Sequence, residues 1–115
     1  MSYCVTIERM YCQCNKDIEQ ELANRDQWYL SFLQTKVGQV GVEDRWFDWR
    51  PKAFLDDLLR LLRLGVRGTI ETLGSNGDWT RYRLTDRGLE VHFGVTTYPE
   101  EPNKVYDAQG GVIDV

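Results

Sequence analysis

Cysteine and histidine are scarce in this sequence, and it contains no long apolar run. Three cysteines are an odd number and too few for the disulfide framework of a small secreted domain. No apolar stretch approaches the roughly 20 residues that a membrane span requires. Residues Met1–Val5 lack the basic and apolar regions of a secretory signal. These absences predict a cytoplasmic chain that does not cross a membrane.

The length and the charge distribution predict one acidic domain with an acidic tail. The chain has 115 residues, which suffice for one hydrophobic core and leave no room for a second. The net charge of −4 disfavours general affinity for nucleic acid, because an acidic chain repels phosphates unless its cations cluster. Residues 51–98 carry seven Lys and Arg against six Asp and Glu, so the acidity lies towards the ends. We expect a single domain over residues 1–98 and an acidic tail over residues 99–115.

The first half of the sequence predicts two strands and two helices. Polar and apolar residues alternate over residues 2–9, as in a strand. Apolar residues then recur at spacings of three, four and seven, which predicts a helix over residues 16–35. Residues 45–49 have the pattern of a short aromatic strand. Pro51 suits the first turn of a second helix, which we expect to stop at Gly65.

The second half predicts a meander of three strands, over residues 66–73, 79–84 and 89–97, with turn residues between them. The expected order is β-α-β-α-β-β-β, an α+β fold with two helices packed on one face of a mainly antiparallel sheet. The tail is predicted to form a short hairpin or to extend into solvent. The other face of the sheet would carry Arg67, Thr69, Glu71, Trp79, Arg81, Arg83, Glu90 and His92.

The residues that could bind a metal or act in catalysis are few. Cys4, Cys12, Cys14 and His92 could supply four zinc ligands. However, one residue separates Cys12 from Cys14, whereas paired zinc ligands usually have two or more between them. The sequence contains no nucleophile elbow, phosphate-binding glycine loop or paired-histidine helix. We therefore expect no metal, no cofactor and no enzymatic activity.

Glu43, Asp44 and Asp48 gather around Trp46 and Trp49. Carboxylates beside aromatic side chains occur in sugar-cleaving sites, where two acids lie on either side of the scissile bond. They also occur wherever a strand leads into a loop, and we expect that second arrangement here.

The second predicted helix and the hairpin after it are rich in arginine. A helix followed by a two-stranded hairpin is similar to the wing end of winged-helix DNA-binding domains. That resemblance implies a helix in the major groove and wing arginines on phosphates. A winged helix also has a compact helix-turn-helix before its wing, and here residues 45–49 separate the helices. This alternative would use Arg60, Arg63, Arg67, Arg81, Arg83 and Arg87.

Five short segments resemble small bacterial and phage proteins of unknown function. In those proteins the chain starts with a strand and ends with a helix and a strand meander. The resemblance implies an α+β fold and a bacterial or phage origin, and it implies no activity. The segments are Met1–Cys4, Gly68–Ile70, Gly77–Trp79, Arg81–Arg83 and Asp86–Gly88.

These patterns favour a small, acidic, non-enzymatic protein-interaction domain that acts as a regulator or inhibitor of another protein. The chain has more aromatic residues than two helical stripes can cover, and tryptophan and arginine dominate binding hot spots. An open sheet face or edge strand would also allow a homodimer. The residues expected to contact a partner are Trp46, Trp49, Trp79, Arg81, Arg83 and His92.

Overall fold

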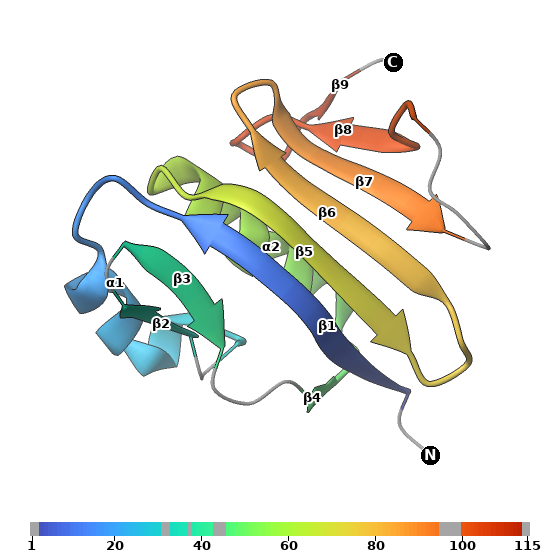
Figure 1. Ribbon diagram of the computed structural model, residues 1–115, viewed down its shortest axis with the longest axis horizontal. Coiled ribbons are helices and arrows are strands. Elements are labelled where there is room, and N and C mark those ends of the chain that lie inside the picture. Colours follow the sequence, from blue (N-terminus) through green and yellow to red (C-terminus); the bar gives the residue numbers. More distant parts are fainter. Residues whose placement is uncertain (1–2, 31–32, 37, 43–45, 95–99, 114–115) are drawn as a thin grey trace.

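The computed structural model describes residues 3–30, 33–36, 38–42, 46–94 and 100–113 (Figure 1). The described strands are β1 Cys4–Gln13, β2 Leu33–Lys36, β3 Gln39–Val42, β4 Trp46–Asp48, β5 Arg67–Gly74, β6 Trp79–Thr85, β7 Gly88–Gly94, β8 Lys104–Tyr106 and β9 Val112–Ile113. The described helical segments are α1 Glu19–Ala23, a 3-10 turn at Arg25–Gln27, and α2 Pro51–Arg63. The prediction of an α+β fold on a mainly antiparallel sheet is confirmed.

The described strands form one sheet in the order β2-β3-β1-β5-β6-β7-β8-β9, and β4 pairs with the first residues of β1. Every pairing between them is antiparallel. The long strands β1, β5, β6 and β7 make the centre of the sheet, and α2 lies behind them in Figure 1. We call the opposite face, which is turned to the viewer in Figure 1, the outer face.

Helix α2 begins and ends close to the predicted residues. Pro51 occupies its first turn, where a missing N–H costs nothing. At its other end Gly65 adopts a φ of 99°, which favours glycine. There the N–H groups of Gly65 and Val66 donate to the carbonyls of Leu62 and Leu61, both at 3.0 Å. This pair of bonds is a Schellman motif, and it turns the chain directly into β5.

Phe54 joins α2 to the sheet. It is 1% exposed, and its ring centroid lies 5.1 Å from that of Tyr82 on β6 and 5.3 Å from that of Phe47 on β4. Tyr82 therefore points towards α2. Because neighbouring residues of a strand point to opposite faces, Arg81 and Arg83 lie on the outer face.

The predicted helix over residues 16–35 is wrong. The chain forms α1, a 3-10 turn and an extended segment that leads to β2. The first helix ends at Asn24, whose φ of −79° and ψ of 72° lie outside the helical region. Of the apolar residues that suggested one helical stripe, Leu22 lies on α1, Tyr29 in the extended segment and Leu33 on β2. Regular spacing of apolar residues cannot distinguish a long helix from several short elements that bury the same side chains.

The element order also differs from the predicted one, because both edges of the sheet contain additional strands. The β2–β3 hairpin turns through Gly38, whose φ is 79°, and it pairs with the end of β1. At the other edge the β8–β9 hairpin pairs with β7, so residues 104–113 extend the sheet. The strand predicted over 89–97 is β7, and residues 95–97 lie outside the described part of the chain.

Asp57 links α2 to the extended segment before β2. Although the residue is only 4% exposed, its carboxylate accepts hydrogen bonds from the backbone N–H groups of Tyr29 at 3.2 Å and Leu30 at 2.6 Å. Burial raises the pKa of Asp57, and the two backbone donors partly offset this effect. Nearby, the Arg60 guanidinium lies 5.0 Å from the ring centroid of Trp28, in the same segment. The segment is therefore held to α2 by polar as well as apolar contacts.

We expect Asp57→Ala to lower the free energy of unfolding by about 2–4 kcal/mol. The substitution leaves two buried N–H groups without their acceptor, and each such group costs about 1–3 kcal/mol. Urea unfolding measures this change. The neighbouring Asp56 is exposed and provides the control, because Asp56→Ala should change stability by less than about 0.5 kcal/mol. Equal effects of the two substitutions would contradict this role of Asp57.

Candidate functional site

The outer face carries a first row of four polar side chains across four strands. In the sheet register Arg9 of β1 lies opposite Glu71 of β5, Glu71 opposite Arg81 of β6, and Arg81 opposite His92 of β7. The Glu71 carboxylate lies between two guanidinium groups, 3.6 Å from Arg9 and 3.5 Å from Arg81. The row therefore alternates in charge from β1 to β6.

A second row lies beside the first. Its members are Tyr11, Thr69, Arg83, Glu90 and Val105, which are opposite one another in register on β1, β5, β6, β7 and β8. The Glu90 carboxylate lies 3.7 Å from the Arg83 guanidinium and 3.6 Å from Nε2 of His92. At one end of this row Tyr11 is 73% exposed, and at the other Val105 is fully buried.

The carboxylates of both rows lie beneath the arginines. The side chains of Glu71 and Glu90 are 10% and 11% exposed, whereas those of Arg9 and Arg83 are 63% and 48% exposed. A buried carboxylate is tolerated only when it is paired. Because the arginines are partly in solvent, each pair contributes at most about 1 kcal/mol to stability. The main effect of the pairs is therefore to hold the guanidinium groups in place on the surface.

Four of the six residues predicted to contact a partner lie on β6 and β7. Arg81 and Arg83 belong to the two rows, and Trp79 starts the same strand. His92 is also in the first row, but it is 2% exposed and so lies below the surface rather than on it. It was expected on a polar strand face, and its burial beside Glu90 was not predicted.

The other two predicted tryptophans lie elsewhere. Trp46 is on β4 opposite Thr6, and its side chain is outside the described part of the structure. The Trp49 ring packs 5.5 Å from Phe54, just before α2. Glu43 and Asp44 are outside the described residues, so a carboxylate group around these tryptophans is not tested.

Trp49 and Trp79 line the same pocket, although they are far apart in the sequence. The pocket has a volume of about 360 Å³ and opens beside the start of α2 and the β5–β6 turn. We call it the aromatic pocket. Its described lining consists of Tyr3, Val5, Trp49, Thr72, Gly74, Asp78, Trp79, Thr80, Tyr82, Phe93 and Gly94.

The six arginines of the nucleic-acid alternative are not brought together on one surface. On α2, Arg60 donates to the Gln27 carbonyl and Arg63 to that of Ala108 at 2.8 Å, both on the side of the sheet opposite Arg81 and Arg83. Arg87 is exposed in the β6–β7 turn.

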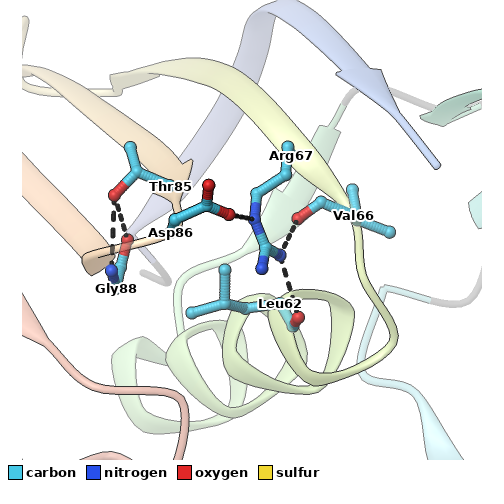
Figure 2. A network of polar contacts seen from close by, with 6 residues as sticks. All are labelled: Leu62, Val66, Arg67, Thr85, Asp86 and Gly88. Atoms are coloured by element: carbon cyan, nitrogen blue, oxygen red, sulfur yellow. Dashed lines mark hydrogen bonds and ion pairs between the residues drawn. The ribbon is translucent and has the colours of Figure 1, made fainter. Parts of the chain in front are cut away.

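Arg67 has a structural role of its own, which Figure 2 shows. Its Nη1 donates to the carbonyls of Leu62 at 3.1 Å and Val66 at 2.9 Å, while its Nε lies 2.9 Å from a carboxylate oxygen of Asp86. The guanidinium thus joins the end of α2 to the β6–β7 turn.

The three cysteines are free thiols that differ in burial. Cys12 and Cys14 are buried, whereas Cys4 at the start of β1 is half-buried. Burial raises the pKa of the Cys12 thiol to about 12, and its contact with the Thr69 carbonyl offsets this only in part. Among the residues that the structure describes, no three His, Cys, Asp or Glu side chains are grouped to hold a metal ion.

The full length of β1 and the bulge within it could not be predicted from the alternation of polar and apolar residues. The strand was predicted to end at residue 9, but it continues to Gln13 with an irregularity between Ile7 and Arg9. This bulge shifts the alternation by one residue, so that Arg9 and Tyr11 reach the outer face. Opposite charges on neighbouring strands, such as Glu71 and Arg81, were the available signal for the paired rows.

No family model, curated protein or solved structure matches the chain. None of the described helices is long and apolar enough to cross a membrane.

We expect Cys12 to resist alkylation in the folded protein. Thiolates are the reactive form, and a pKa of about 12 leaves roughly one thiolate in ten thousand at pH 8. Iodoacetamide treatment followed by peptide mass spectrometry should show modification of Cys4 first and of Cys12 only after denaturation in urea. Rapid labelling of Cys12 in the native protein would contradict the burial described here.

Proposed function

We propose that this chain is a non-enzymatic protein-interaction domain and that its outer face binds the partner. The observation that supports this most directly is the pair of rows on that face. They present Arg9, Arg81 and Arg83 at the surface above two buried carboxylates, and no described helix covers them. Tyr11 adds a large exposed aromatic side chain at the β1 end of the second row.

The rows suit binding because they are ordered before a partner arrives. Immobilising a long side chain costs about 0.5–1.5 kcal/mol on binding. Here Glu71 holds Arg81 and Glu90 holds Arg83 in the free protein, so much of that cost is already met within the fold. Arginine and tyrosine are also among the residues that contribute most at protein interfaces. His92 would support Glu90 from below rather than touch the partner.

The role proposed for such a domain is that of a small regulator or inhibitor of bacterial or phage origin. The charged groups of the outer face are arranged to neutralise one another, which fits recognition of a surface better than proton transfer to a substrate. A second copy of this chain is one candidate partner, because the side chains of Arg9 and Arg83 are 63% and 48% exposed on a sheet face that no described helix covers.

We expect Tyr11→Ala and Arg83→Ala each to weaken partner binding by about 2 kcal/mol, roughly thirtyfold in Kd. The partner is first captured from lysate with the tagged chain, with and without nuclease treatment, and is then titrated against purified variants. Tyr11 is 73% exposed, so its removal should leave the melting temperature unchanged. Exposed Lys52 on α2 provides the control, and Lys52→Ala should bind normally.

Two results would count against this assignment. Normal binding by both outer-face variants would place the interface elsewhere on the chain. Recovery of nucleic acid, with a steep loss of affinity as salt is added and weakened binding by Arg87→Ala, would favour the arginine-based alternative.

A further inference from the structure

The aromatic pocket has rigid walls. Phe54 packs against two of them, with its ring centroid 5.5 Å from that of Trp49 and 5.1 Å from that of Tyr82. On a third side, the backbone N–H of Phe93 donates to a side-chain oxygen of Asn103 at 2.8 Å, which fixes the end of β7. Three sides of the pocket are therefore held in place by contacts within the described part of the fold.

Tyr3 closes the pocket next to the β5–β6 turn. Its hydroxyl donates to the Asn76 side-chain oxygen at 2.6 Å. The hydroxyl lies so close to Gly74 that a Cβ added there would be 1.7 Å away, so only glycine allows this contact. Burial and then the nearby charge of Asp78 raise the pKa of Tyr3, so its hydroxyl keeps its proton and remains a hydrogen-bond donor to Asn76.

Asp78 is the one charged residue among those described that line the pocket. Asn76 donates to one of its carboxylate oxygens at 2.8 Å, so the carboxylate is held in position. Five aromatic residues share the lining with it. The faces of aromatic rings carry partial negative charge, and they attract cations within about 6 Å of the ring centroid. Phe93 already shows this behaviour, because the Lys104 ammonium lies 5.8 Å from its centroid.

The two tyrosine hydroxyls of the pocket are little available to a ligand. Tyr82 is 7% exposed, and its burial raises its pKa to about 12. The Tyr3 hydroxyl is bonded to Asn76. A sugar needs several donors and acceptors that converge on its own hydroxyls, whereas one tyrosine hydroxyl here is already bonded and the other belongs to a buried side chain. A ligand that carries positive charge but donates no hydrogen bonds matches the lining better.

We propose that the aromatic pocket binds a quaternary ammonium group. The trimethylammonium head would contact the faces of Trp49, Tyr82 and Phe93, with Asp78 supplying the opposite charge. The volume of about 360 Å³ lies at the lower end of the range of roughly 300–1,000 Å³ for ligand sites and suits a small head group. Such a group occurs in choline-like molecules and in trimethylated lysine of a protein. This site is separate from the outer face, so it does not depend on the protein-interaction proposal.

The first experiment titrates the protein with choline while the indole N–H signals are followed by NMR. We expect saturable shifts of the Trp49 and Trp79 signals. Trp28 is an internal control, because its indole N–H donates to the Glu21 carbonyl at 2.8 Å and does not line the pocket. The neutral isostere, in which a tert-butyl group replaces trimethylammonium, should bind about tenfold more weakly.

Two variants test the two sources of attraction. Asp78→Asn removes the charge while keeping the shape and should weaken choline binding about fivefold or more, whereas Asp56→Asn on α2 should not change it. Phe93→Leu keeps an apolar side chain but removes the ring and should weaken binding roughly threefold to fivefold. Phe93 is 47% exposed, so this substitution should not unfold the protein.

A parallel titration with a trimethyllysine peptide and its unmethylated form shows whether the natural ligand is a trimethylated protein or a small choline-like molecule. Tighter binding of the trimethylated peptide than of choline would identify a protein ligand, and the reverse would identify a small molecule.

Three outcomes would overturn the proposal. They are equal binding of choline and its neutral isostere, shifts that do not saturate, and shifts of Trp28 as large as those of Trp49.

Discussion

The contact between Phe54 and Tyr82 is the constraint on which the two surfaces depend. It fixes α2 to one face of β6, with the ring centroids 5.1 Å apart. Because side chains alternate along a strand, it also fixes Arg81 and Arg83 on the opposite face. The same phenylalanine packs against Trp49 and so positions a wall of the aromatic pocket. A single buried ring therefore determines where both the charged rows and the pocket lie.

The charged rows illustrate a division between stability and recognition. Replacing buried ion pairs by apolar side chains is often neutral or stabilising, so pairs such as Glu71 with Arg81 are weak evidence for a purely structural purpose. Within each pair the two partners differ in exposure, since the carboxylate is nearly buried and the arginine is partly in solvent. An arrangement that orders cations at the surface at little gain in stability is what a binding face requires.

Local patterns predicted the parts of the fold that depend on neighbouring residues. The leucines after Pro51 predicted α2, and alternation with intervening turns predicted the meander from β5 to β7. The pattern was misleading over residues 16–35, where long-range contacts such as that of Asp57 with Leu30 stabilise an extended segment. The aromatic pocket could not be predicted from the sequence, because Tyr3, Trp49 and Phe93 are far apart in the chain and the folded sheet brings them together. The burial of His92 has the same origin, since it depends on packing across strands.

Trp79 lies where the two surfaces come closest. It starts β6, lines the aromatic pocket, and lies two residues before Arg81 of the first row. Elsewhere the two surfaces are separated by the thickness of the sheet, and interiors packed at crystal-like density do not deform continuously. Trp79 therefore lies on the shortest path along the chain between the pocket lining and the arginine rows. This half-buried tryptophan is thus the residue of the predicted partner-binding set that lies nearest to both surfaces.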